Sequence, residues 1–312
     1  NMNITPSNNS LLIGYNKKFL KFKKLYDDQK LPNRIIFSGN SGIGKSTFAY
    51  HLTNYILSKN EEYKYNYYEN VISKSSRAFN LVLKNSHPNF YLITNRNDKK
   101  NIVISEVREM INFTNKSSFN NGCKIILIDN VEFLNTNSVN ALLKTIEEPN
   151  NKIFFFLIHN NKINILDTIK SRCIKFNFFL KNEDKINVIK NICDQYFYEN
   201  LNEDFKNSYN TPGDIFKIFH CFKSNNIDEN IIVDDFLKLV INEKLYKKDT
   251  FIKDNLSFFL ELYFNKLFNK YKSKTKIYNL YRYFLSKISD CNKYNLDIEN
   301  ILIEFSGNVL SE

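Results

Sequence analysis

Short apolar runs alternate with helical patterns through the first half of the chain. Runs rich in β-branched and aromatic residues occur at 34–37, 90–93, 124–129, 153–158 and 173–176. Runs of this length are typical of strands that are buried on both faces. Between them, apolar residues recur three and four positions apart, as in Ile104, Val107 and Ile111, or in Val139, Leu142, Leu143 and Ile146. Strands that alternate with helices predict a parallel sheet covered on both faces.

The strand signals end near residue 176, and the rest of the chain has helical periodicity. Residues 183–198 are predicted as one helix, with Ile186, Ile189, Ile192, Cys193 and Tyr196 along one stripe. A second stripe consists of Ile277, Leu280, Tyr281, Phe284, Leu285 and Ile288. These spacings are those of an amphipathic helix that packs in a bundle. The polar tract 223–230 is the expected linker between the middle and last parts.

Chain length and apolar content indicate a folded protein with two or three domains. The 312 residues include 43% apolar side chains, enough to bury a sizeable core. No apolar run approaches the roughly 20 residues of a membrane-spanning helix. Residues 1–20 are polar and Asn-rich, without the apolar block of a signal peptide. We therefore expect a soluble, cytoplasmic protein with no membrane partner.

Neither the cysteines nor the histidines indicate a metal site. None of the five cysteines forms a CxxC pair, and the four histidines show no ligand spacing. We expect reduced thiols, with neither a disulfide framework nor bound zinc. The net charge of +11 leaves two interpretations open. Lys and Arg neutralise DNA phosphates, but the excess of Lys, Asn, Ile, Phe and Tyr is also typical of an A+T-rich genome.

One glycine-rich segment has the pattern of a phosphate-binding loop. Residues 39–46 read GNSGIGKS, which matches GxxxxGK[ST], and they lie between a predicted strand and a predicted helix. In such a loop, backbone N–H groups and the helix N-terminus face phosphate oxygens. Lys45 is expected to reach the terminal phosphates and Ser46 to coordinate Mg²⁺. The segment predicts a site for ATP or ADP with Mg²⁺.

A carboxylate at the end of a neighbouring strand completes this pattern. Residues 124–129 read KIILID, which looks like a Walker B strand, so Asp129 is expected to hold Mg²⁺ together with Ser46. The alternative is a strand-end or helix-capping aspartate. Asn130 follows, where hydrolytic AAA+ proteins commonly have Glu, and an amide cannot accept a proton from water. We therefore expect slow or absent hydrolysis. The predicted nucleotide contacts are Gly39, Asn40, Ser41, Gly42, Ile43, Gly44, Lys45, Ser46, Thr47 and Asp129.

Several further stretches occur in a recognisable order. They are LIG at 12–14, the phosphate-binding loop, HPNF at 87–90, ISEVREM at 104–110, the Walker B strand, NALLKTIEEP at 140–149 and ILDTIKSRC at 165–173. On these motifs, residues 12–176 resemble the AAA+ core of clamp-loader subunits, and LLKTIEEP paired with SRC is the most specific signal. The resemblance is closest to the delta-prime type of bacterial DNA polymerase III, because of HPNF, the missing Walker B Glu and ILDTIKSRC.

The resemblance to the SRC motif implies that Arg172 acts in trans. Such an arginine reaches a neighbouring subunit's site and stabilises charge on the γ-phosphoryl oxygens; the alternative is an ordinary surface arginine. Glu147 and Glu148 are expected at a helix end or interface and not as catalytic acids. The resemblance also implies that basic residues of the inner helices, such as Arg108, face the DNA backbone.

The chain departs from the family pattern at three places. Residues 58–86 contain no cysteine, so the four-cysteine zinc module of many relatives is not carried over. Residues 211–217, near the usual second sensor arginine, contain no Arg. At the first sensor position, usually Thr, residues 158–160 offer His159 or Asn160. The missing arginine further favours weak hydrolysis, and the role of His159 or Asn160 stays open.

We predict an α/β fold with a second, helical part. An AAA+ RecA-like core with a parallel five-stranded sheet is expected at 1–176, a helical lid at 177–222 and a helical collar that assembles a pentamer at 223–312. The predicted function is that of a delta-prime-type subunit, with gamma/tau and delta subunits, the sliding clamp and primed DNA as partners. Two alternatives stay open: a gamma/tau-type motor ATPase, and a scaffold that binds no nucleotide. A P-loop kinase is disfavoured because the chain has only a helical tail where kinases place an acceptor site.

Overall fold

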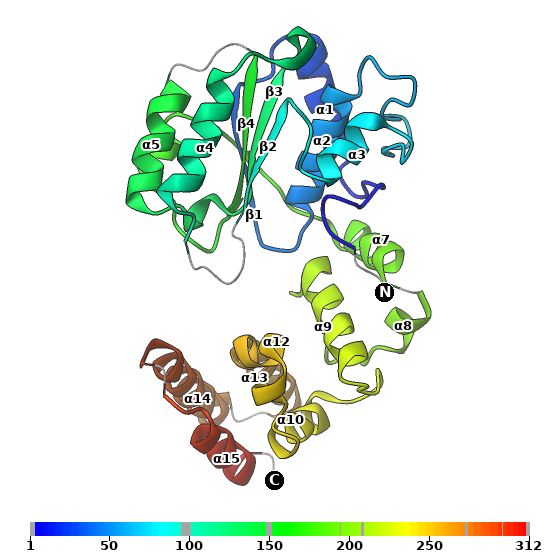
Figure 1. Ribbon diagram of the computed structural model, residues 1–312. Helices are drawn as coiled ribbons and strands as arrows, with labels where there is room; N and C mark the ends of the chain where they lie inside the picture. Colours follow the sequence, from blue (N-terminus) through cyan, green and yellow to red (C-terminus); the bar gives the residue numbers. More distant parts are fainter. Residues whose placement is uncertain are drawn as a thin grey trace. The chain divides into compact units, whose positions relative to one another are not determined.

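Figure 1 shows a computed structural model in which the chain forms two compact units. The structure describes residues 4–94, 101–147, 152–193, 195–206, 209–271, 274–294 and 296–309. The first unit comprises Asn1–Val188 and Thr211–Gly213, and the second comprises Ile189–Asn210 and Asp214–Glu312. Of the predicted motif residues, Glu148 and Pro149 lie outside the described residues.

The first unit is built around a five-stranded parallel sheet, as predicted. Its strands are β1 (Arg34–Gly39), β2 (Phe90–Ile93), β3 (Lys124–Ile128), β4 (Ile153–Asn160) and β5 (Ile174–Asn177), in the order β2-β3-β4-β1-β5. In the register, Gly39 lies opposite Asn160 and Ile128 lies opposite Leu157. The carboxyl ends of the three central strands therefore meet at one edge of the sheet.

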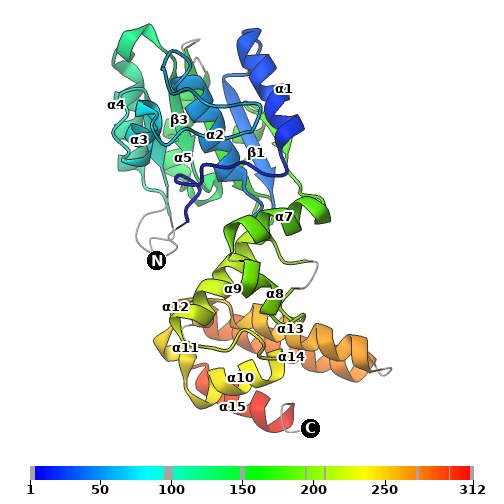
Figure 2. The same ribbon diagram turned by 90° about the vertical axis from the view of Figure 1, so that its right-hand side faces the viewer.

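Helices cover both faces of this sheet (Figures 1 and 2). One face carries α1 (Asn16–Asp27), α2 (Lys45–Leu57) and α3 (Arg77–Leu83), and the other carries α4 (Ile104–Asn115) and α5 (Thr136–Glu147). Successive residues of a strand point to opposite faces of the sheet. Ile35 and Phe37 therefore pack with α1 and α2, and Ile36 packs with α4 and α5 on the other face. Short helices η1 (Phe119–Asn121), η2 (Val131–Phe133) and α6 (Asp167–Lys170) complete the unit.

A group of phenylalanines fixes α1 and α2 on the sheet. Phe19, Phe22, Phe37 and Phe48 are fully buried, and the ring of Phe48 meets that of Phe178 edge-on at 4.9 Å between centroids. Burial of each such side chain contributes about 1.5–3 kcal/mol. Helix α1 was not predicted because lysines dominate its sequence and only two of its residues, Phe19 and Phe22, are buried.

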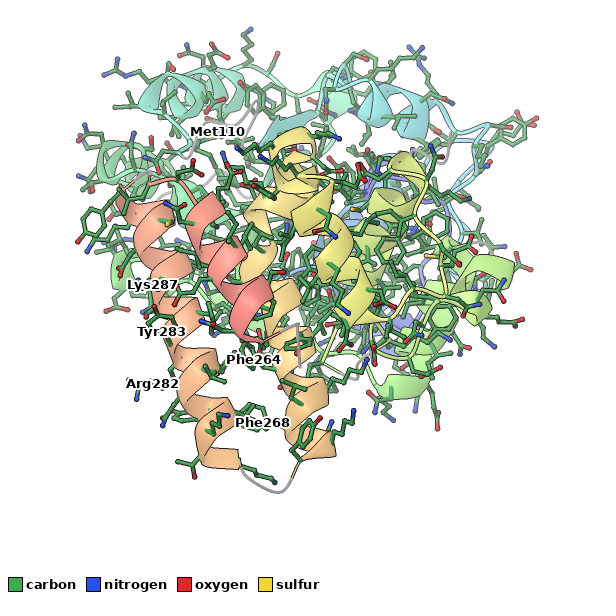
Figure 3. The ribbon with its side chains drawn as sticks, turned by 90° about the horizontal axis from the view of Figure 1, so that it is seen from below. Met110, Phe264, Phe268, Arg282, Tyr283 and Lys287 are labelled. Atoms are coloured by element: carbon green, nitrogen blue, oxygen red, sulfur yellow. The ribbon has the colours of Figure 1, made fainter. Side chains whose placement is uncertain are left out.

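The second unit is helical, as the periodicity predicted. It contains α8 (Gln195–Asn200), α9 (Pro212–Ser224) from Asp214 onward, α10 (Val233–Asn242), α11 (Leu245–Lys248), α12 (Thr250–Asp254), α13 (Leu256–Lys270), α14 (Lys274–Tyr294) and α15 (Glu299–Asn308). The predicted stripe on α14 is confirmed, because Ile277, Phe284 and Ile288 are buried. Figure 3 shows Phe264 and Phe268 of α13 between α13 and α14, with Arg282 on the opposite side of α14.

One predicted helix is divided in the structure. Residues 183–198 were expected to form one helix, but α7 (Asn182–Ile192) ends before α8 begins at Gln195. Ile189 and Cys193 are buried as the stripe predicted. Apolar spacing thus identified buried residues without indicating where one helix ends and the next begins. Residues 225–232 connect α9 with α10 at the predicted linker, and the division into a lid at 177–222 and a collar at 223–312 stays a prediction. Among the described helices, none is both long and apolar enough to cross a bilayer.

Candidate nucleotide-binding site

The glycine-rich loop lies between β1 and α2, as its pattern predicted. Gly42 and Gly44 have φ angles of +77° and +89°, a left-handed conformation that glycine adopts without strain. Gly44 is the N-cap of α2, so the first N–H groups of this helix have no intrahelical acceptor. The loop thus has the backbone geometry that binds an anion at a helix N-terminus.

Tyr15, just before α1, anchors the glycine-rich loop. The Tyr15 hydroxyl donates a hydrogen bond to the Ile43 carbonyl at 2.7 Å, and Ile43 itself is buried. In contrast, Asn40, Ser41 and Gly42 are exposed at the tip of the loop. The buried anchor and the exposed tip leave the loop's outer backbone accessible to a ligand. Thr47 of α2, also predicted as a contact, is half-buried.

Lys45 folds back over the loop. Its ammonium donates to the carbonyl oxygens of Gly39 at 2.9 Å and Asn40 at 2.6 Å. Burial lowers the pKa of Lys45 to about 8, while the Glu132 and Asp129 carboxylates oppose this shift. The carbonyl oxygens of Gly39 and Asn40 therefore hold the Lys45 ammonium. In the P-loop pattern this ammonium is the group that contacts the terminal phosphates.

Ser46 and Asp129 meet as predicted. The Ser46 hydroxyl lies 3.1 and 3.2 Å from the two carboxylate oxygens of Asp129 and donates to this carboxylate. The N–H of Asp129 donates to Ile93 O at 2.8 Å, which fixes the residue at the end of β3. Burial raises the pKa of Asp129, and the Ser46 hydroxyl and the Lys45 ammonium lower it. A hydroxyl beside a carboxylate is the protein part of a magnesium site in this kind of fold.

A second carboxylate, which sequence reasoning missed, lies at the same edge. Glu132 belongs to η2, directly after β3, and its two carboxylate oxygens each lie 3.3 Å from the N–H of Asn160. Burial raises the pKa of Glu132, while backbone N–H groups, His159 and Lys45 lower it. The Walker B pattern places the catalytic carboxylate at position 130, directly after Asp129, so it does not indicate Glu132. Asn130 itself has a left-handed backbone, with φ of +60°.

The two candidate sensor residues at the end of β4 have different roles in the structure. His159 is buried, with Nδ1 3.0 Å from Ser38 Oγ and Nε2 2.7 Å from Ile163 O. Asn160 lies beside the glycine-rich loop in the sheet register and is half-buried. Its side-chain oxygen accepts a hydrogen bond from the Lys162 N–H at 3.2 Å. Asn160 is therefore the better placed of the two to face a ligand.

Gly213 packs on the glycine-rich loop. The N–H of Gly213 donates to the Gly42 carbonyl at 2.9 Å. A Cβ at Gly213 would lie 2.6 Å from Gly42 Cα, so this backbone contact requires glycine.

Arg172 lies at the surface after α6, outside the Lys45 and Asp129 cluster. Its Nε and Nη2 donate to Glu147 Oε1 at 2.9 and 2.6 Å, and Nη1 donates to Thr168 O at 3.1 Å. The side chains of Arg172 and Glu147 are 35% and 49% exposed. Glu147 is therefore a helix-end surface residue, and a guanidinium at this place is accessible from outside the chain.

The described residues fit a magnesium nucleotide. Gly42 and Gly44 have the left-handed backbone of a phosphate-binding loop, the Lys45 ammonium lies at the loop, and Ser46 and Asp129 offer oxygen ligands. No cluster of three or more His, Cys, Asp or Glu that could hold a metal by itself occurs in the described part of the chain. This is compatible with Mg²⁺, which binds through few protein oxygens and phosphate. The expected absence of zinc stays a prediction.

The sheet order and this loop define the class of protein: an AAA+ fold with a P-loop between its first strand and the following helix. A family model described as "DNA polymerase III, delta subunit" matches residues 14–182, more than half of the chain. The chain therefore belongs to this family of DNA polymerase III subunits.

Curated relatives carry the more specific name DNA polymerase III subunit delta′. The chain is 30% identical to that of Pseudomonas aeruginosa over 128 residues, which are 41% of this chain and 37% of the relative. It is 25% identical to that of Escherichia coli K12 over 139 residues, which are 45% and 40% of the two chains. The chain thus matches less than half the length of these relatives. It is of the delta-prime type.

A solved structure supports the fold over nearly the whole chain. A DNA polymerase III gamma subunit-related protein from Thermotoga maritima aligns with a TM-score of 0.51 at 15% identity. The alignment covers 93% of this chain and 97% of that chain. At this identity the comparison supports the architecture alone.

Proposed function

We propose that the protein acts as the delta-prime-type subunit of a cytoplasmic clamp loader and binds ATP or ADP with Mg²⁺. The observation that carries the nucleotide site is the contact of Ser46 with Asp129 next to Lys45, within a loop whose glycines have the left-handed backbone. Family membership supports the assembly. Its partners are then gamma/tau and delta subunits in a pentamer, which loads the sliding clamp onto primed DNA.

The residues of the site have separate tasks in this proposal. Lys45 exchanges the carbonyls of Gly39 and Asn40 for phosphate oxygens. The hydroxyl of Ser46 and the carboxylate of Asp129 hold Mg²⁺, directly or through water. Magnesium supplies positive charge that neutralises the phosphates. The N–H groups at the start of α2 complete the cradle.

Hydrolysis by this chain is proposed to be weak. Asn130 offers no carboxylate, and residues 211–217 contain no arginine that could reach terminal phosphates. A turnover of about 1 s⁻¹ by the isolated chain, typical of a competent NTPase, would contradict the proposal. It would favour the gamma/tau-type motor instead.

Arg172 is proposed to serve a neighbouring subunit. Its guanidinium is partly exposed, and among the described residues it bonds to Glu147, Thr168 and Ser171 of the same surface. An exposed ion pair of this kind contributes about 0.2–1 kcal/mol. A neighbour's triphosphate, with more charge than one carboxylate, is able to compete for Arg172.

A groove between α4 and α5 is the proposed place for the DNA backbone. Arg108, Lys116 and Lys144 line it together with asparagines and threonines. Lysine and arginine contacts of this kind bind phosphates without reading sequence.

An equilibrium titration with a fluorescent ATP analogue tests the nucleotide site. We expect saturable binding by the wild-type chain and a loss of about 10- to 100-fold in affinity for Lys45→Ala, the range for a lost charge-assisted hydrogen bond. Lys21→Ala, an exposed lysine of α1, is the matched control and should bind as wild type. No binding by the wild-type chain would favour the scaffold without nucleotide.

A further inference from the structure

Positive charge is concentrated on α14 of the second unit. The 21 residues of this helix include five basic side chains and one acidic side chain, a net charge of +4. The whole chain of 312 residues carries +11, so an even spread of charge would leave less than one unit on α14. The basic residues are Lys274, Lys276, Arg282, Lys287 and Lys293, and the acidic residue is Asp290. Composition by itself therefore does not explain this helix.

Two tyrosines of α14 each have a cation one helical turn further along. The Arg282 guanidinium lies 5.8 Å from the centroid of the Tyr278 ring, and the Lys287 ammonium lies 5.2 Å from that of Tyr283. Tyr278 and Tyr283 are 48% and 40% exposed, and both cations are exposed too. The Tyr283 hydroxyl donates to Glu304 Oε1 at 2.7 Å, which fixes that ring. Figure 3 labels Arg282, Tyr283 and Lys287 along the helix.

A third pair extends this surface to the end of the helix. The Lys293 ammonium lies 5.1 Å from the centroid of the Tyr294 ring, and Tyr294 is 60% exposed. From Tyr278 to Tyr294 the helix rises about 24 Å. None of the ion pairs between described residues involves a basic group of α14. We call this surface the α14 face; it consists of Lys276, Tyr278, Arg282, Tyr283, Lys287, Lys293 and Tyr294.

Exposed rings next to cations favour one kind of ligand over two others. A duplex is bound through its phosphates by cations alone, because its bases are stacked on one another. Protein interfaces are depleted in lysine, whereas three of the four cations on this face are lysines. A single strand offers phosphates to the cations and base faces to the tyrosine rings.

We propose that the α14 face binds single-stranded DNA, with bases stacked on Tyr278, Tyr283 and Tyr294. The ligand is DNA because the chain belongs to a family of DNA polymerase III subunits. The face lies in the second unit and uses no residue of the groove between α4 and α5, which belongs to the first unit. Its binding of a single strand does not depend on the nucleotide site.

Fluorescence anisotropy measures this binding when a fluorescein-labelled 20-mer of thymidylate is titrated with the full chain at several salt concentrations. We expect Tyr278→Ala to weaken binding about 10-fold, the effect of one lost base stack, and Tyr278→Phe to bind as wild type. The double variant Arg282→Ala with Lys287→Ala should reduce the slope of log affinity against log salt by about 1.4, for two lost phosphate contacts.

An abasic 20-mer and two control variants separate stacking from charge. The abasic strand keeps the phosphates but has no bases, so it should bind the wild-type chain and Tyr278→Ala equally. Tyr68→Ala removes a tyrosine that is 82% exposed in the first unit. Lys217→Ala with Lys253→Ala removes two exposed lysines of the second unit that lie outside α14. Both controls should bind the thymidylate strand as wild type.

Several results would overturn the inference. They are a wild-type chain that does not bind the thymidylate strand, a Tyr278→Ala chain that binds it as wild type, and an abasic strand that binds the wild-type chain as tightly. Impaired assembly of Tyr278→Ala with the other subunits, together with normal strand binding, would assign the face to a subunit contact instead. Loss of strand binding in Arg108→Ala with Lys144→Ala, with the α14 variants unaffected, would place the strand in the groove of the first unit. That result would overturn the α14 site and support the proposed groove.

Discussion

Asn130 has a structural reason to be the residue after the Walker B aspartate. Its backbone is left-handed, with φ of +60° and ψ of +63°, and asparagine tolerates this region better than longer side chains do. The left-handed turn starts η2, which carries Glu132 back to the sheet edge. The residue type at 130 could be read from the sequence. The carboxylate two positions later could not, because its approach depends on a backbone dihedral angle.

Substitutions at Asn130 test this explanation. Asn130→Glu should lower the free energy of unfolding by about 1 kcal/mol, because glutamate gains nothing that offsets the left-handed backbone. Asn130→Gly should be close to wild type, since glycine adopts this conformation freely. Urea denaturation followed by circular dichroism measures both. A glutamate variant as stable as wild type would show that the turn imposes no strain.

At the scale of elements, α2 begins at the phosphate-binding loop and contacts the chain near Asn9 through His51. His51 of α2 is fully buried, with Nδ1 2.9 Å from the Tyr65 hydroxyl and Nε2 3.0 Å from Asn9 O. Burial lowers the pKa of His51 to about 4, although the Asn9 carbonyl opposes the shift. The neutral imidazole of His51 thus links α2 to Tyr65 through one ring nitrogen and to Asn9 through the other.

We expect His51 to make the first unit sensitive to acid. An unfolded histidine titrates near pH 6.5 and the folded one near 4, so the unfolded state binds the proton first. Stability from this group is complete above about pH 6.5 and is lost as the pH falls toward 4. We expect a loss of about 2 kcal/mol between about pH 7.5 and pH 5, measured by urea denaturation at each pH.

His51→Gln provides the control for that prediction. Glutamine does not titrate and can still hydrogen-bond, so the variant should show a smaller fall in stability over the same pH range. An equal fall in both proteins would mean that other groups, and not His51, cause the acid sensitivity.

At the scale of the whole molecule, the chain forms two units with separate hydrophobic cores. The first carries the P-loop and Arg172, and the second is a helical bundle with its own aromatic core, in which the rings of Phe284 and Phe305 lie 5.1 Å apart. The hydrogen bonds of Arg172 in the described part of the first unit go to Glu147, Thr168 and Ser171, none of which belongs to the Lys45 cluster. Its proposed role therefore belongs to the assembly.

Arg172→Ala tests the assembly. In a clamp loader reconstituted from all its subunits, we expect ATP hydrolysis at the neighbouring site to fall about 10³-fold, as for other arginine fingers. Nucleotide binding by the isolated chain should not change. Lys170→Ala removes a cation from α6, the short helix that ends just before Arg172, where Lys170 pairs with Asp167; this variant should leave hydrolysis intact. A reconstituted Arg172→Ala complex with wild-type hydrolysis would exclude the trans role.

The sequence alone determined the class of this protein, because a parallel sheet and a phosphate-binding loop are encoded locally. Apolar runs predicted all five strands, and a glycine pattern with Lys45, Ser46 and Asp129 predicted a site whose parts the structure brings together. Tertiary structure alone decided what surrounds that site. The contacts are those of Glu132 with Asn160, of Gly213 with Gly42 and of Glu147 with Arg172. Each joins residues far apart in the chain, so no local pattern predicts it.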